Sequence, residues 1–301
     1  MKNAKEYIRT DLAAESMPPL ETLEDANIAG DSGILYNEET IGGFKVETLK
    51  VINERGEAVT GRPVGTYVTI SVGKLWIAAD EQIEAAIDII ADTLREMAEQ
   101  LAPGGGGVLV CGLGNRDITS DAIGPLAVRE ITVTRHIKGS DTRLFELLGA
   151  REISAIAPGV VGQTGIETLE LVRGAVENSG PSLLVVIDAL AARSTDRLAA
   201  TIQLCDTGIS PGSGIGGSRK AINAEQLGIP VIAIGVPTIV DSSTLVCDAL
   251  EKAGFDDIPQ SLEEVLENGR SFFVSRGDSD ISVQALSSVI ASAINTAFLG
   301  N

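Results

Sequence analysis

Basic residues, histidine, cysteine and aromatic residues are all scarce in this sequence of 301 residues. Lysine and arginine number 23 against 42 aspartates and glutamates, which gives a formal net charge of −19. A surface of that sign repels phosphate backbones, so we expect no nucleic-acid partner. The three cysteines, at 111, 205 and 247, have no short spacing that would suggest a disulfide framework or a cysteine-ligated zinc. Their expected role is to fill the core.

The single histidine, His136, limits the catalytic mechanisms open to the chain. Any Ser-His-Asp or Cys-His arrangement, and any histidine-ligated metal, would have to use this one residue. His136 follows Arg135 at the end of a predicted helix, where a positive charge suits the helix dipole. This position favours a capping role over catalysis.

Long apolar segments are also missing. The longest runs, such as LLVVI at 183–187, are far shorter than the roughly 18 residues needed to cross a bilayer. The N-terminal stretch has no apolar signal-peptide core. We therefore expect a cytoplasmic protein without a membrane partner.

Aliphatic side chains and glycine are plentiful, with 44% hydrophobic residues, 3% aromatic residues and 33 glycines. From Val108 onward, short apolar runs alternate with helical patterns, which predicts an α/β fold with a mostly parallel twisted sheet and helices on both faces. The predicted strands are VLVCGLG from 108, ISAIAP from 153, SLLVVIDAL from 182, TIQLCD from 201 and PVIAIGVP from 230.

The remaining elements are predicted from hydrophobic periodicity and from the positions of glycine and proline. Residues 1–43 are polar, without periodicity, and indicate an arm and loops before short strands near 44–52 and 66–72. The stretch 256–280 is predicted to be a surface excursion. Helices are predicted at 79–101, 121–135, 165–178, 241–253 and 282–298.

Aspartates stand at the predicted ends of several strands. Ligand sites of open α/β sheets lie outside the carboxyl ends of the strands, so we expect these carboxylates to converge on one edge. Asp188 closes a run of five apolar residues, where an ionised carboxylate is costly unless a cation or a donor stabilises it. Two such carboxyls can share a proton and activate water against an amide, although a single aspartate there could simply cap a helix. The residues are Asp117, Asp121, Asp188, Asp206 and Asp241.

Neither glycine-rich turn near the first strand suits a nucleotide. GGGG at 104–107 precedes a strand instead of following one, and GLGNRD at 112–117 lacks the third glycine of a dinucleotide fingerprint. SPGSGIGG at 210–217 does follow a strand. With Arg219 and Lys220 beside it, this stretch would suit an anion site or a mobile flap, and otherwise it is an irregular surface loop.

Several motifs along nearly the whole chain are shared with one family. They are YIRTDLA at 7–13, GLGN at 112–115, SDAIGPLAV at 120–128, APGVVGQTGIET at 157–168, IDALAAR at 187–193, DTGISPGSGIG at 206–216 and GIPVIAIGVPTIVD at 228–241. In these motifs the sequence resembles the spore germination proteases, which degrade small acid-soluble spore proteins. It is more distantly similar to the hydrogenase maturation proteases.

The resemblance implies an atypical aspartic endopeptidase whose essential pair matches Asp121 and Asp188. Asp117 falls where the family has a neutral residue, so it is left out of the pair. We take Asp121 as the base, because a helix N-terminus favours its anion by roughly 0.3–1 kcal/mol. Asp188 is then the proton donor, because an apolar strand favours its acid form. No cofactor is implied, and the participation of a metal stays open.

The resemblance further implies a homotetrameric zymogen of the forespore that loses a short N-terminal segment. The family cuts after an acidic residue that is followed by an apolar residue and alanine, and TDLA at 10–13 has this pattern. The expected cut between Asp11 and Leu12 makes residues 1–11 a propeptide and residues 12–301 a single peptidase domain.

A cation is expected to bind the acidic residue before the cut. The candidates are Arg193, Arg135, Arg219 and Lys220. A second class of function remains open, namely a metal-dependent peptidase or a metal-binding module that uses the same acidic edge with Glu167 or His136 as further ligands.

Overall fold

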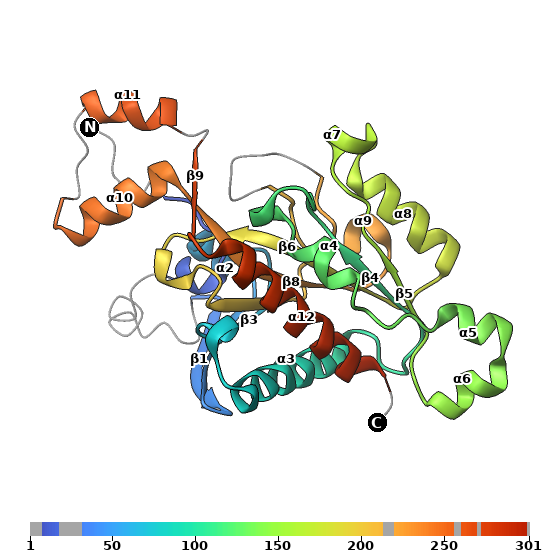
Figure 1. The fold of residues 1–301 in the computed structure, drawn as a ribbon. Helices are drawn as coiled ribbons and strands as arrows, with labels where there is room; N and C mark the ends of the chain where they lie inside the picture. Colours follow the sequence, from blue (N-terminus) through green and yellow to red (C-terminus); the bar gives the residue numbers. More distant parts are fainter. Residues whose placement is uncertain (1–7, 18–31, 213–219, 256–259, 270–271, 300–301) are drawn as a thin grey trace.

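The computed structural model describes residues 8–17, 32–212, 220–255, 260–269 and 272–299. In these residues nine strands form one sheet in the order β1-β2-β3-β7-β8-β6-β4-β5, and β9 pairs with β8 (Figure 1). The strands are β1 (Ile34–Ile41), β2 (Phe44–Val51), β3 (Gly65–Ser71), β4 (Val108–Gly112), β5 (Ile153–Ile156), β6 (Leu183–Ala191), β7 (Thr201–Cys205), β8 (Val231–Asp241) and β9 (Phe273–Ser275).

The centre of the sheet is parallel, as the alternation of strands and helices predicts. Strands β5, β4, β6 and β8 run in one direction, whereas β1, β2, β3 and β7 pair antiparallel. The chain between β6 and β7 spans only residues 192–200. A crossover that restores the strand direction needs a dozen or more residues, so β7 enters the sheet antiparallel to β8.

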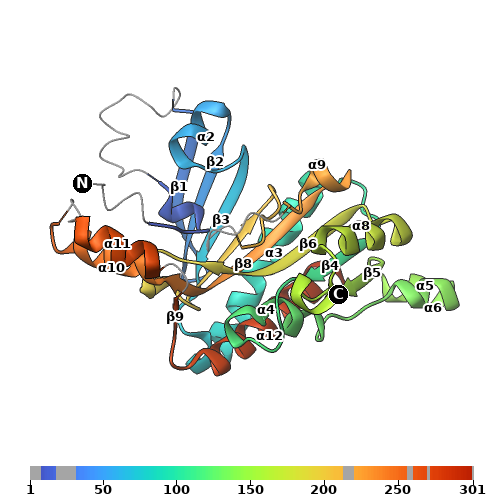
Figure 2. The same ribbon diagram turned by 90° about the horizontal axis from the view of Figure 1, so that it is seen from above.

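Alternating side chains of the parallel strands supply two core layers on the two faces of the sheet. In β6, Leu183, Val185 and Ile187 pack with the cluster of α3 and α12, while Leu184 and Val186 pack with α8. Figure 2 shows α4 and α12 on one side of the sheet and α8 on the other, and α3 shares the apolar cluster of α12. The α-helices are α2 (Glu54–Thr60), α3 (Asp80–Leu101), α4 (Ile123–Val128), α5 (Arg135–Ser140), α6 (Thr142–Leu148), α7 (Val161–Thr164), α8 (Thr168–Ser179), α9 (Ala224–Leu227), α10 (Ser242–Lys252), α11 (Gln260–Gly269) and α12 (Ser279–Phe298).

By length and composition alone, α12 is a helix that could cross a membrane. Its most apolar window is 56% buried within the protein. Leu286, Ile290 and Ile294 are fully buried and belong to the cluster shared with α3 and the sheet. The helix is therefore apolar because it lies in the core.

The N-terminal arm and the first crossover helix differ from the sequence-based expectation. Residues 34–41 form an edge strand whose side chains are mostly exposed, so its sequence lacks the apolar pattern of a buried strand. Gly42 and Gly43 (φ 57° and 86°) form the two-residue turn typical of a hairpin. The helix expected over 121–135 is only α4, and His136 lies at the start of the separate helix α5. The capping role proposed for His136 at a helix C-terminus is therefore wrong.

Candidate active site

Asp188 lies where the neighbouring strand β4 stops. Gly112, the last residue of β4, pairs with Ile187, and β6 continues beyond this point along β8 to Ala191. Asp188 is thus inside β6, not at its end as the sequence suggests, and its side chain is 6% exposed. Its Oδ1 accepts a hydrogen bond from the backbone N of Ala189 at 2.9 Å.

Asp121 reaches the same place through a loop that folds back on β4. It ends the 3₁₀ turn η4 (Thr119–Asp121) directly before α4, and its Oδ2 accepts a hydrogen bond from the backbone N of Asn115 at 2.7 Å. A Cβ on Gly114 would lie 2.0 Å from the carbonyl O of Asp121. A Cβ on Gly124 would lie 2.3 Å from the carbonyl O of Leu113. The glycines of the GLGN and AIG motifs thus let α4 approach the strand ends.

Gly124→Ala is expected to destabilise the protein by about 1–3 kcal/mol, because the new methyl group meets backbone that cannot move aside. Gly174, inside α8, is the matched control because nothing lies within 4 Å of its ideal Cβ. Gly174→Ala is expected to stabilise the protein by about 0.5–1 kcal/mol, since alanine is the better helix former. Urea unfolding measures both changes. Equal effects of the two substitutions would contradict the tight contact at Gly124.

Two cavities of about 250 Å³ each meet at Asp188. Asp11 and Leu190 also line both of them. We call the one that Asp121 lines the dyad cavity, and the one that Gln203 lines the glutamine cavity. The carboxylates of Asp121 and Asp188, which the sequence predicts to be a pair, are thus both at the dyad cavity, together with Asp11 of the predicted cleavage site.

Residues 8–17, here named the strap, meet both cavities at Asp11. Asp11 N donates to the Ala191 carbonyl at 2.8 Å, and Ala191 N donates to Asp11 Oδ2 at 2.9 Å. Leu12 is fully buried and packs in an apolar cluster. The other buried members of that cluster are Leu190, Ala192, Leu198 and Val240. Asp11 is therefore held against the end of β6 and lines the same cavities as Asp188, and Leu12 is enclosed in the core.

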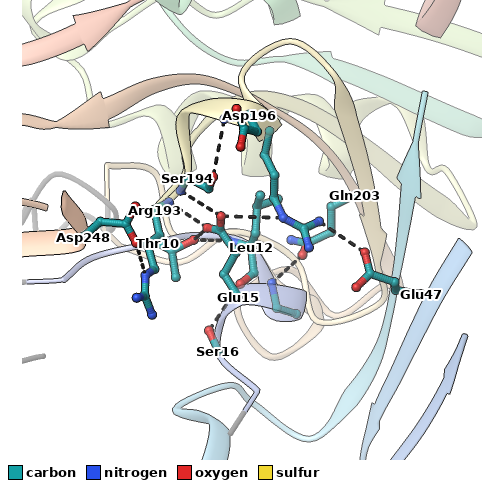
Figure 3. A network of polar contacts seen from close by, with 12 residues as sticks. Thr10, Leu12, Glu15, Ser16, Glu47, Arg193, Ser194, Asp196, Gln203 and Asp248 are labelled. Carbon is teal, nitrogen blue, oxygen red and sulfur yellow. Dashed lines mark hydrogen bonds and ion pairs between the residues drawn. The ribbon is translucent and has the colours of Figure 1, made fainter. Parts of the chain in front are cut away.

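Glu15 anchors the C-terminal side of the strap (Figure 3). Its two carboxylate oxygens accept hydrogen bonds from the backbone N of Arg193 at 2.7 Å and of Ser194 at 2.9 Å. Arg197 Nε lies 3.7 Å away, and the hydroxyl of Thr10 also donates to Glu15. The Glu15 side chain is only 6% exposed. Buried charge-assisted hydrogen bonds of this kind hold a segment firmly.

Arg62 also holds the strap. Its Nη2 donates to the carbonyl O of Thr10 at 2.7 Å and to the hydroxyl of Ser16 at 2.9 Å. Arg62 also lines the glutamine cavity. The sequence gives no signal for this role, because Arg62 lies in the short loop between α2 and β3 and meets the strap only in the folded protein.

The cations proposed to bind the acidic residue before the cut are placed elsewhere. The guanidinium of Arg193 binds Asp248 at 2.8 Å and Glu251, and Arg135 pairs with Glu152 at 3.2 Å. Neither lines the dyad cavity or the glutamine cavity, Lys220 is exposed, and Arg219 lies outside the described residues. The Asp11 carboxylate accepts from a backbone N–H instead, so the placement of Arg193 and Arg135 argues against this prediction.

The other strand-end aspartates do not join the pair. Asp117 is exposed, and Gln163 Nε2 lies 3.4 Å from its Oδ2. Asp206 follows the antiparallel strand β7 and accepts from Thr66 N at 2.7 Å, while Asp241 caps α10 through Thr244 N at 3.0 Å. The expected convergence of all these carboxylates on one edge is therefore wrong, because β7 runs in the opposite direction and Asp241 caps a helix.

The buried cysteines and the proposed metal ligands do not add to this site. Burial raises the pKa of the Cys111 thiol and also that of Cys205. Both stay protonated thiols and are poor nucleophiles. The described residues contain no group of three or more His, Cys, Asp or Glu side chains that could hold a metal, and His136 and Glu167 line neither cavity.

An α/β protein in which two aspartates line one cavity has the features of an enzyme. More specifically, the chain belongs to the germination protease family, whose family model, described as "Germination protease", matches residues 11–254. The resemblance seen in the sequence motifs is thereby confirmed.

Proteins named "Germination protease" cover most of this chain. The one from Clostridium acetobutylicum is 37% identical over 313 residues, which is 96% of this chain and 94% of that protein. The one from Caldanaerobacter subterraneus is 44% identical over 246 residues, covering 81% of this chain and 72% of that protein. The one from Bacillus pumilus is 41% identical over 254 residues and matches 81% of this chain but 66% of its own length.

Among solved structures, the [NiFe] hydrogenase maturation protease HycI from Thermococcus kodakarensis is similar at 17% identity with a TM-score of 0.31. The match covers 58% of this chain and 99% of that protein.

Proposed function

We propose that the protein is an aspartic-type endopeptidase that degrades small acid-soluble spore proteins during germination. It acts in the cytoplasm of the forespore and the spore core, as a homotetramer made as a zymogen. Residues 1–11 are the propeptide and residues 12–301 the peptidase domain. One observation supports the proposal: Asp11, which precedes the apolar Leu12 and then Ala13, lines a cavity that Asp188 and Asp121 also line.

The two carboxylates have different surroundings that suit different roles. The Asp121 carboxylate accepts from Asn115 N and is half-buried, which supports its role as the anion that takes a proton from water. Asp188 is buried next to apolar strand residues, which supports its role as the acid. Water then attacks the carbonyl carbon of residue 11, its proton passes to Asp121, and the nitrogen of residue 12 leaves with the proton of Asp188.

Contacts of the strap indicate how a substrate would be selected. A carboxylate before the cut accepts from Ala191 N, as Asp11 does. An aliphatic residue after the cut enters the apolar cluster that encloses Leu12. The next position suits a small residue, since Ala13 is fully buried. These requirements match a cut within sequences of the type acid, apolar residue, alanine.

Self-processing is the direct test. Incubation of the full chain is expected to produce a new N-terminus at Leu12, detected by N-terminal sequencing and by the mass of the intact protein. Asp188→Asn should keep its original terminus, since it lacks the proton donor. Active protein that retains residues 1–11 would refute the propeptide.

Substrate choice is tested with an unfolded small acid-soluble spore protein. Mass spectrometry of the products should show cuts after an acidic residue that precedes an apolar residue and alanine. Cuts at unrelated sequences would show that Ala191 N and the apolar cluster around Leu12 do not select the substrate. Sedimentation of the same preparation tests the tetramer.

A further inference from the structure

Gln203 is a buried polar residue that lies in line with Asp188 across the sheet. It belongs to β7 and is 5% exposed. Gln203 pairs with Gly235 of β8, and Gly235 pairs in turn with Asp188 of β6. Residues directly opposite one another on neighbouring strands project from the same face, so Gln203 and Asp188 flank Gly235 with their Cα atoms roughly 10 Å apart. The Leu190 side chain covers Gly235, since its Cδ1 would lie 2.3 Å from a Cβ on that glycine.

The side-chain amide of Gln203 holds the strap on both sides of the Asp11–Leu12 bond. Nε2 donates to the carbonyl O of Asp11 at 3.2 Å, and Oε1 accepts from the backbone N of Ala13 at 2.7 Å. A backbone N–H can only donate and a carbonyl O can only accept, so these two contacts fix the orientation of the amide. The donor end of Gln203 therefore points at the carbonyl of the Asp11–Leu12 bond.

Arg62 makes a useful contrast. Its Nη2 donates to the carbonyl O of Thr10 at 2.7 Å and lies 3.4 Å from that of Leu12, so it contacts the carbonyls before and after Asp11. Arg62 thus positions the peptide, whereas Gln203 contacts the carbonyl that reacts.

We infer that Gln203 is a further catalytic residue that stabilises the negative charge on the carbonyl oxygen during cleavage. This inference rests on the proposed function. When water attacks the carbonyl carbon, the π electron pair moves onto the oxygen, and Asp121 receives the water proton. As the pair returns, the C–N bond breaks, and Asp188 protonates the leaving nitrogen. Nε2–H of Gln203 donates to the oxygen throughout, and a donor fixed before reaction lowers the barrier without reorganisation.

Gln203→Glu tests the donor with little change in shape. The introduced carboxylate still accepts from Ala13 N but offers no N–H to the Asp11 carbonyl. The rate constant for self-processing of the full chain, followed by intact-protein mass spectrometry, is expected to fall about 10²–10³-fold, as is typical for loss of one such donor. Gln226→Glu, an exposed position on α9, is the matched control and should process at the parent rate.

The pH dependence of the processing rate of Gln203→Glu distinguishes a hydrogen-bond donor at position 203 from a residue that only packs. Where the introduced carboxyl becomes protonated it can donate again, so the deficit relative to the parent should shrink as pH falls. Thermal unfolding checks that the variant is folded. If it is not, Gln203→Asn replaces it, because this variant keeps the amide but withdraws it by one methylene and should also slow processing.

The outcomes distinguish this inference from the proposed function. Processing of folded Gln203→Glu at the parent rate, or a deficit that does not change with pH, overturns the role of Gln203 alone. Absence of processing in the parent, or processing by Asp188→Asn, overturns the proposed function itself.

Discussion

Replacing Asp121 or Asp188 by asparagine is expected to slow peptide cleavage by about 10³-fold, a typical loss for a general acid or base. Asparagine has the shape of aspartate but cannot exchange a proton. Its Oδ1 can still accept from Asn115 N in the first case and from Ala189 N in the second. The fold should therefore survive, and circular dichroism together with the rate of self-processing would report the two effects separately.

Asp117→Asn is the matched control for this pair. Asp117 comes from the same loop as Asp121, but it is exposed and lines neither cavity. A surface substitution of this kind changes a free energy by about 0.5 kcal/mol or less, which corresponds to roughly a twofold change in rate. An active double variant of Asp121 and Asp188 would show that the two residues are not the catalytic pair. A comparable loss of activity in Asp117→Asn would show that Asp117 takes part in catalysis.

Local patterns in the sequence predict the parallel centre of the sheet and its main helices. The spacing of Ile83, Ile90, Leu94 and Leu101 and the PGGGG that follows define α3 within a residue of its observed bounds. The apolar run before Asp188 predicts a buried strand that carries a carboxylate, and the structure has this strand. These features depend on neighbouring residues, so local sequence contains them.

Features that depend on distant pairing could not be predicted in the same way. The register that aligns Gln203, Gly235 and Asp188 joins three strands, and the direction of β7 depends on the short connection before it. Arg193 illustrates the same limit. Its charge and its place after the DALAA sequence suggest substrate binding, yet helix α10 brings Asp248 to its guanidinium and only its backbone N reaches the strap.

Progress curves with an added peptide are expected to begin with a lag, because the strap occupies the contacts that a substrate needs. Asp11, Leu12 and Ala13 use Ala191, the apolar cluster and Gln203. If the strap is released in only about 1% of uncut molecules, the initial rate is about 1% of the final rate. Cutting divides the strap into two parts that no longer hold each other in place, so each part leaves more readily. The lag should equal the self-processing time measured in the same sample.

Weakening the anchor should raise that initial rate. Glu15→Ala removes the carboxylate that accepts from Arg193 N and Ser194 N, and hydrogen bonds to a charged group contribute about 1.5–3 kcal/mol each. Loss of even 1.4 kcal/mol makes release of the strap tenfold more favourable, so the initial rate on added peptide should rise at least about tenfold. Glu177→Ala, at an exposed position of α8, should leave the lag unchanged. A curve that is linear from the start in the uncut parent, or a slower initial rate in Glu15→Ala, would show that the strap does not block the substrate.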